Sequence, residues 1–195
     1  KKDPAYEAPD MGNEKIDIPT ISSIINRLNN HFSEMSDTVS RTLKIGQMKR
    51  DNCNFEMVSI KPFIVEVVDA HFSDQNRFEV IVKQPKGRLE GQIDKIHFQR
   101  IIYNLIDNAN RHGFDDTRKY EIIFDINHDK EAKEIIIDYK DNGKGFPAGY
   151  TVNEYKTWGR SSGGTAGTGI GGADIFRTIE LHRGRTEVIS IEDGV

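Results

Sequence analysis

The chain has 195 residues, 36% hydrophobic and 30% charged, and is therefore long enough for one soluble domain with a sizeable core plus an appendage. Its net charge of −4 argues against a nucleic-acid partner, and no apolar run approaches the roughly 20 residues of a membrane span. The single cysteine, Cys53, cannot form an internal disulfide, and no cysteine–histidine cluster has zinc spacing, so we expect a reducing, cytoplasmic setting without membrane contact. The first residue, Lys1, indicates a piece of a longer protein whose other parts could carry a membrane anchor.

Residues 1–19 are polar and lack periodicity, and we interpret them as a linker or arm. Residues 20–52 are dominated by an amphipathic helix with apolar positions alternately four and three apart: Ile21, Ile25, Leu28, Phe32, Met35 and Val39. This heptad seam is suited to packing against another helix. The helix could lie along its own domain, but so narrow a seam favours one member of a dimerisation bundle completed by segments outside this chain.

Residues 53–195 predict a unit in which strands and helices are mixed. Alternating or β-branched segments predict strands at 57–60, 78–82, 89–92, 120–127, 134–139 and 185–191. Helical periodicity and capping residues predict helices at 62–72, at 94–113 with Asp94 as N-cap, and at 169–182, with a loop over 150–166. This order is typical of an α+β, two-layer sandwich with one mixed sheet and helices on one face.

The central predicted helix carries polar side chains of an unusual kind on one face. Ile101 and Leu105 fall on one side of a helical wheel, whereas Asn104, Asn108 and Arg111 fall on the other. Asn is a mediocre helix former, so two of them one turn apart with an arginine nearby indicate a face turned towards a ligand. Taken alone, the pattern is equally compatible with an ordinary polar helix face.

Two glycine clusters follow this helix. The first, 141–146, directly follows a strand, so that the Asp141 carboxylate could accept a hydrogen bond from an amino group such as that of adenine. An ordinary hairpin turn would have the same Asp-Asn-Gly sequence. The second, 163–172, opens a helix whose first N–H groups would form an anion site suited to phosphate. It follows a polar loop rather than a strand, unlike a dinucleotide-binding motif, and no P-loop sequence occurs.

The motifs stand in a recognisable order: Asn-x-x-x-Asn-Ala on a helix, Asp-x-Gly-x-Gly after a strand, a polar loop, and Gly-x-Gly-x-Gly at a helix start. This order resembles the Bergerat-type ATPase fold shared by DNA gyrase, the ninety-kilodalton heat-shock chaperones, MutL and sensor histidine kinases. The segments FQRIIYNLIDNANRH, DNGKGF and GTGIGG are most similar to the N-box and the two glycine boxes of histidine-kinase catalytic domains. The resemblance covers residues 55–195 and implies an ATP-binding catalytic domain over 53–195.

The resemblance also implies a role for each matching residue. Asn108 would bind the Mg²⁺ that bridges the ATP phosphates, with Asn104 and Arg111 as further catalytic residues, and Asp141 would bind the adenine amine. The other residues expected to contact ATP are Arg111, His112, Gly143, Gly145, Phe146, Gly167, Thr168, Gly169, Ile170 and Gly171. Residues 147–166 would form the ATP lid, with Lys156 and Arg160 as candidate cations for the γ-phosphate.

The identity of residue 104 separates two reaction classes. Gyrase-like members of the group carry a glutamate there that activates water, and the amide of Asn104 cannot accept that proton. The sequence therefore favours a kinase that transfers the γ-phosphoryl group to a histidine, with a second copy of the chain and a response regulator as partners in two-component signalling. The alternatives are a nucleotide-binding regulatory module, such as a degenerate kinase or an anti-sigma-type serine kinase acting through a protein partner, and a gyrase-like ATPase.

His31 is the candidate phosphoacceptor within this chain, because an acid stands three residues after it on the first helix. No proline follows in the place usual for the family, and too few residues separate His31 from Met57 for the rest of a two-helix bundle. We therefore interpret residues 20–50 as the second bundle helix and expect the phosphorylated histidine upstream of this chain. Other histidines, including His97 and His182, are expected at the surface.

Overall fold

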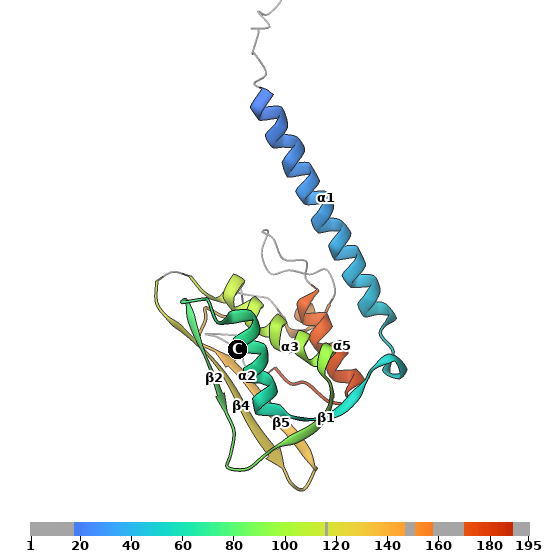
Figure 1. Ribbon diagram of the computed structural model, residues 1–195, viewed down its shortest axis with the longest axis vertical. Coiled ribbons are helices and arrows are strands. Elements are labelled where there is room, and N and C mark those ends of the chain that lie inside the picture. The colour runs from blue at the N-terminus through green and yellow to red at the C-terminus, as the bar shows by residue number, and fades with distance from the viewer. Residues whose placement is uncertain (1–17, 116, 147–150, 158–169, 189–195) are drawn as a thin grey trace, which may run out of the picture. The chain divides into compact units, whose positions relative to one another are not determined.

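The computed structural model describes residues 18–115, 117–146, 151–157 and 170–188. Its contacts divide the chain into two compact units, residues 1–40 and residues 41–195. The described part of the first unit is the larger portion of helix α1 (Ile18–Gln47), and the second unit contains the other described elements (Figure 1).

Helix α1 carries the predicted apolar seam. Its seam residues are all at least 44% exposed: Ile21, Ile25, Leu28, Phe32, Met35 and Val39. An apolar stripe left in water is unfavourable, so this exposure agrees with the packing against another helix that the heptad spacing predicts. Within the described ranges, no helix combines the length and the apolar content needed to cross a bilayer.

The second unit alternates strands and helices in nearly the predicted order. Its strands are β1 (Phe55–Ser59), β2 (Phe78–Lys83), β3 (Glu90–Asp94), β4 (Tyr120–Asp129) and β5 (Glu134–Asp141). Its helices are a 3-10 turn at Arg50–Asn52, α2 (Ile60–Phe72), α3 (Lys95–Asn108) continued by a π-helical turn at Ala109–Gly113, α4 (Val152–Lys156) and α5 (Gly171–Leu181). The α+β class predicted from the sequence is confirmed.

The strands form two hydrogen-bonded groups. In the mixed sheet, β4 lies between β2, to which it is parallel, and β5, to which it is antiparallel. Strands β1 and β3 form a separate antiparallel pair, with Phe55 opposite Asp94, instead of extending that sheet as the prediction of one sheet requires. This pairing brings the segment after α1 to the start of α3.

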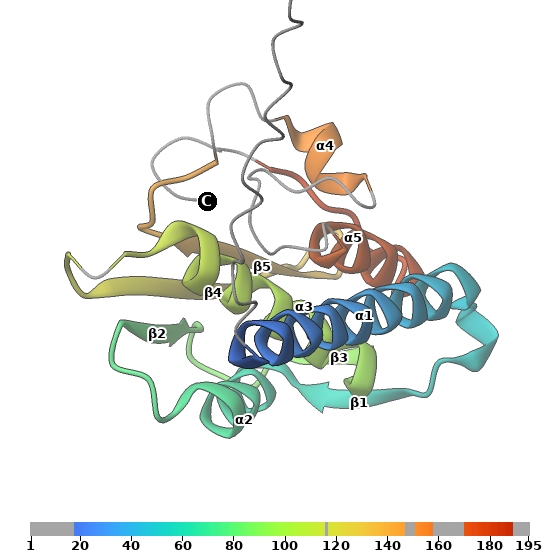
Figure 2. The same cartoon turned by 90° about the horizontal axis from the view of Figure 1, so that it is seen from above.

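The core lies between the mixed sheet and helices α2 and α3. Alternate residues of β4 are buried, as expected for a strand with one covered face, and Phe124 is only 1% exposed. Phe124 belongs to the same buried cluster as Ile64 of α2 and Ile106 of α3. Helix α5 runs beside α3 (Figures 1 and 2), so the helix with the Asn-rich motif is a neighbour of the described end of the second glycine cluster, Gly171 and Gly172.

Two sequence predictions are wrong in their described parts. The expected loop over 150–166 contains α4, which begins with a capping box in which the Thr151 hydroxyl accepts from the Glu154 N–H at 3.2 Å. The expected strand over 185–191 pairs with no strand over its described residues, 185–188. The Arg185 side chain instead contacts the Glu134 carboxylate, with Nη2 lying 2.7 Å from Oε2.

Candidate functional site

Helix α3 presents its two asparagines to the beginning of α5. Asp94 caps the helix as predicted, because its Oδ1 accepts the His97 N–H at 3.0 Å. A methyl group built on Gly171 would lie 3.4 Å from Asn108 Oδ1 and 3.8 Å from Asn104 Cγ. The first N–H groups of a helix have no intrahelical acceptor, so an anion bound at this end of α5 would lie beside both amides.

The first glycine cluster begins where β5 ends. The Asp141 Oδ1 accepts the Gly143 N–H at 2.9 Å, and Oδ2 lies 3.3 Å from the hydroxyl of Tyr139. Burial raises the pKa of the Asp141 carboxyl above its usual value, although these hydrogen bonds act in the opposite direction. The structure thus presents a half-buried carboxylate with one oxygen already committed to the turn that follows it.

The C-terminal end of the Asn-rich motif meets this glycine turn. The Lys144 N–H donates to Gly113 O at 3.0 Å. A side chain at position 143 would lie 2.8 Å from Asp141 Oδ1 and 2.9 Å from Gly113 O, so only glycine permits this approach. Residues from all three motifs therefore converge around the C-terminal half of α3.

Helix α4 lies against the same region through Tyr155. The Asn108 Nδ2 donates to the Tyr155 hydroxyl at 3.2 Å, and the Tyr155 ring lies 5.1 Å from the ring of Phe146. The backbone of Tyr155 is packed so closely on α5 that a methyl group at Gly172 would lie 2.1 Å from its carbonyl oxygen. The part of the expected lid that the structure describes is thus in contact with both asparagine and glycine motifs.

Replacing Gly172 by Ala should lower the free energy of unfolding by about 1–3 kcal/mol, because the backbone of Tyr155 must move to admit the methyl group. Urea denaturation would measure this loss. Gly171→Ala is the matched control, since its methyl group would make ordinary contacts of 3.4 Å or more, and its stability should stay within about 0.5 kcal/mol. Equal stability of the two variants would contradict the close packing of α4 on α5.

The remaining predicted site residues have less specific surroundings. Arg111 is exposed, with Nε 2.8 Å from Asp107 Oδ1, and His112 is exposed. Lys156 places its ammonium 4.6 Å from the centre of the Phe176 ring. Gly145 lies in the turn after Asp141, whereas Ile170 is buried with Met48 and Leu181. Four predicted residues, Arg160, Gly167, Thr168 and Gly169, lie outside the described residues.

The candidate phosphoacceptor lies on α1, where His31 is exposed and its Nδ1 lies 3.6 Å from a Glu34 carboxylate oxygen.

A buried carboxylate that the sequence patterns did not reveal lies next to Asn104. Asp174 of α5 is 4% exposed, and its Oδ2 accepts from Arg100 Nη2 at 2.7 Å and from Asn104 Nδ2 at 3.1 Å. Its Oδ1 is buried and has no hydrogen-bond partner among the described residues. An acid flanked by Ala173 and Ile175 on a helix was the available sequence signal, because a charge among apolar positions requires a buried partner.

Two histidines expected at the surface belong to a contact network near the N-terminus of α3. His182 Nε2 accepts the Asp94 N–H at 3.0 Å, and its Nδ1 lies 2.7 Å from Thr178 O. His97 is about four-fifths buried, with Nδ1 2.9 Å from Asp94 Oδ1. Burial lowers the pKa of His182, which favours the neutral ring that these two contacts require.

Comparison with known proteins identifies a family to which this sequence is similar. Residues 93–194 match the model of the histidine kinase-, DNA gyrase B- and HSP90-like ATPases. The sensor histidine kinase YvrG of Bacillus subtilis is 25% identical over an alignment of 181 positions that covers 89% of this chain and 30% of that protein. The chain spans less than a third of the length of the curated relatives that it matches.

Solved histidine kinases share the fold. The Acinetobacter baumannii kinase AdeS superposes with a TM-score of 0.55 at 18% identity, over 87% of this chain and 77% of that one. Full-length ShkA, solved in complex with AMPPNP, gives a TM-score of 0.62 at 14% identity, over 93% of this chain and 38% of that one. With more than half of its residues matched by one family, the chain belongs to the histidine kinase-, DNA gyrase B- and HSP90-like ATPases.

Proposed function

We propose that this chain is the ATP-binding catalytic part of a sensor histidine kinase, which binds Mg²⁺-ATP and donates its γ-phosphoryl group to a histidine in two-component signalling. The observation that carries the proposal is the convergence of Asn108, Gly171 and the Asp141 turn around the C-terminal half of α3. Each of these belongs to a different motif, and together they offer a metal ligand, an anion site and a carboxylate.

The phosphate end of the nucleotide would lie at the start of α5. There the free N–H groups of the helix and its positive dipole end favour an anion, and Asn108 Oδ1 lies beside Gly171. An amide oxygen is a ligand that Mg²⁺ accepts, so Asn108 would hold the ion, which neutralises phosphate charge when bound. Arg111 and Lys156 are the described cations proposed to contact phosphate.

The adenine end would lie at the glycine turn after β5. The carboxylate of Asp141 would accept a hydrogen bond from the adenine amine, and Gly143 lets the turn that fixes this carboxylate pack closely on Gly113. His112, Gly145 and Phe146 complete the proposed pocket wall.

The proposed reaction depends on positioning rather than on a base from this motif. Asn104 donates to Asp174 and has no group that could take a proton from water, which disfavours hydrolysis. Phosphoryl transfer requires mainly orientation and charge neutralisation, which the groups named above supply. The acceptor histidine would stand on a dimerisation bundle of a longer protein.

The proposed assembly follows from α1. We propose that residues 20–52 form a bundle helix and that residues 53–195 form the catalytic domain. The exposed seam of α1 would pack against a second copy of the chain, which is the usual means of burying a heptad stripe. A response regulator and a cytoplasmic location complete the proposal.

Calorimetry with a non-hydrolysable ATP analogue and Mg²⁺ tests this function, with Asp141→Asn as the diagnostic variant. In this variant the amide oxygen would stay at the Oδ1 position, because the Gly143 N–H needs an acceptor there. The amide NH₂ would then take the Oδ2 position, where it would face the adenine amine, a second donor, and no hydrogen bond could form. We expect affinity to fall by about 10- to 100-fold, as for loss of a hydrogen bond to a charged group. Wild-type affinity should also fall as the pH drops through the raised pKa of Asp141, whereas the Asn variant should show no such decline.

Asp138→Asn is the matched control, because residue 138 points to the opposite face of β5 and should leave ATP affinity unchanged. A 6-oxopurine nucleotide provides a second readout: its carbonyl can accept from the new NH₂, so the preference for adenine should shrink in Asp141→Asn. A folded wild-type protein that binds no ATP analogue would disprove the proposed function.

A further inference from the structure

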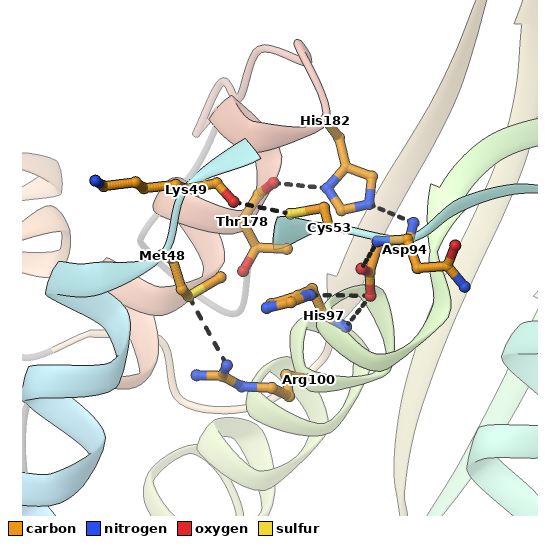
Figure 3. A network of polar contacts seen from close by, with 9 residues as sticks. Met48, Lys49, Cys53, Asp94, His97, Arg100, Thr178 and His182 are labelled. Atoms are coloured by element: carbon orange, nitrogen blue, oxygen red, sulfur yellow. Dashed lines mark hydrogen bonds and ion pairs between the residues drawn. The ribbon is translucent and has the colours of Figure 1, made fainter. Parts of the chain in front are cut away.

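Three metal-ligating side chains meet at the N-terminal end of α3. The β1–β3 register places Phe55 opposite Asp94, so Cys53, two residues earlier, lies next to the helix cap. The Asn54 N–H donates to Asp94 Oδ2 at 2.7 Å and fixes this approach. Figure 3 shows Cys53, Asp94 and His97 gathered from these two segments.

The ligand atoms of these residues are already close. Cys53 Sγ, a carboxylate oxygen of Asp94 and a ring nitrogen of His97 all lie within 4.8 Å of one another. The His97 Nδ1 is shielded from solvent and forms no well-aligned hydrogen bond with any described residue, although Asp94 Oδ1 is 2.9 Å away. The thiol of Cys53 is not in a disulfide, and its Sγ makes a long contact of 3.6 Å to Lys49 O.

This combination of donors matches a particular class of cation. Around a tetrahedral zinc ion, neighbouring ligand atoms lie about 3.3–3.7 Å apart. Side-chain rotations that move the ligand atoms by about an ångström would therefore bring them to this spacing. Each Asp94 oxygen accepts one N–H and keeps a second lone pair. A thiolate and an imidazole select zinc-like ions over Mg²⁺ and Ca²⁺, which prefer oxygen alone.

We propose that Cys53, Asp94 and His97 bind a zinc-class divalent cation, with water in the fourth position. His182 supports the site without being a ligand, because its two ring nitrogens are already in contact with the Asp94 N–H and Thr178 O. The bound ion would cross-link the segment that follows α1 to the first turn of α3 (Figure 3).

The proposed metal site is separate from the proposed nucleotide site. Asp94 and Asn108 stand at opposite ends of the 14-residue helix α3, which makes them about 20 Å apart. Metal binding can therefore be tested without nucleotide, and its outcome is independent of whether the chain binds ATP.

The test is titration of the metal-free full chain with Co²⁺, a spectroscopic substitute for Zn²⁺. Cys53 is the chain's one cysteine, so a thiolate-to-cobalt charge-transfer band reports this site alone. We expect such a band to saturate at one Co²⁺ per chain, to vanish when Zn²⁺ is added, and to persist in excess Mg²⁺. A folded wild-type protein that develops no band at millimolar Co²⁺ would overturn the proposal.

Variants separate a three-residue site from a lone thiol. Asp94→Asn removes the charge while keeping one side-chain oxygen for the His97 N–H, and His97→Gln removes the imidazole. Each should weaken Co²⁺ binding by at least about 100-fold, since even changes to residues behind a metal ligand cost 10- to 100-fold. His31→Gln, an exposed histidine on α1, should have no effect. Unchanged affinity in both Asp94→Asn and His97→Gln would show that Cys53 binds the metal alone and would refute the site.

Discussion

Replacing Arg100 by Leu is expected to lower the free energy of unfolding by about 3–5 kcal/mol, because the variant leaves a buried carboxylate without its ionic partner. Asp174 is 4% exposed, and Arg100 Nη2 lies 2.7 Å from its Oδ2. The remaining donor, the Asn104 amide, is neutral and at 3.1 Å cannot replace a guanidinium. Equilibrium urea unfolding of the full chain would measure the loss.

The double variant Arg100→Leu/Asp174→Leu should recover most of that stability, since an apolar pair can fill the same space without a desolvated charge. An exposed ion pair provides the comparison: Lys119 Nζ lies 3.3 Å from Glu79 Oε2 at the surface, and Lys119→Gln should cost less than about 1 kcal/mol. If the double variant loses as much as the sum of the two single variants, the two residues are not coupled.

The pH dependence gives an independent check on the same pair. Burial raises the pKa of the Asp174 carboxyl, and the Arg100 charge acts against that rise. A carboxyl whose pKa is higher in the folded state costs stability above that pKa, and the cost disappears as the pH falls through it. Removal of Arg100 raises the pKa further, so Arg100→Leu should regain stability relative to wild type on acidification.

Sequence patterns predicted the features of this fold that are set by neighbouring residues. Asp94 was recognised as an N-cap because capping depends on the three residues that follow it. Strands β4 and β5, which pair with each other, were recognised as strands because two β-branched runs stand on either side of a short turn. The three motifs were recognised by their order, and the structure brings their described residues together around α3.

Features that depend on distant residues could not be predicted in the same way. Arg100 and Asp174 are 74 positions apart, and nothing local marks them as partners. Cys53 and His97 were separately interpreted as a lone cysteine and a surface histidine, because only the β1–β3 register brings them together. The separation of that strand pair from the mixed sheet likewise depends on long-range pairing. Helix α4 was different, since its Thr-x-x-Glu capping box is local and was overlooked.

Replacing Asn108 by Ala should remove the Mg²⁺-dependent part of nucleotide affinity and leave the metal-free part in place. The Asn108 Nδ2 is engaged by the Tyr155 hydroxyl at 3.2 Å, so Oδ1 is the atom offered to an ion at the start of α5. Mg²⁺ is held by few protein oxygens and keeps several waters, so the loss of one such oxygen is severe. We expect the affinity gained on adding Mg²⁺ to fall by about 100-fold, equivalent to about 2.8 kcal/mol. Calorimetry with the ATP analogue, in Mg²⁺ and in chelator, measures both parts.

Asn110→Ala is the matched control, because it removes the same chemical group two residues further along. The Asn110 Oδ1 accepts a hydrogen bond from Arg77 Nη1 at 3.2 Å and is therefore not offered to the ion. Asn110→Ala should still gain nucleotide affinity when Mg²⁺ is added. The ratio of affinities with and without Mg²⁺ isolates the metal ligand from general damage to the pocket, which would lower both values together. An unchanged ratio in Asn108→Ala would mean that another group holds the ion. If Mg²⁺ fails to raise the affinity of both variants, the cause would instead be distortion of the π-helical turn, Ala109–Gly113, whose last residue contacts the first glycine cluster.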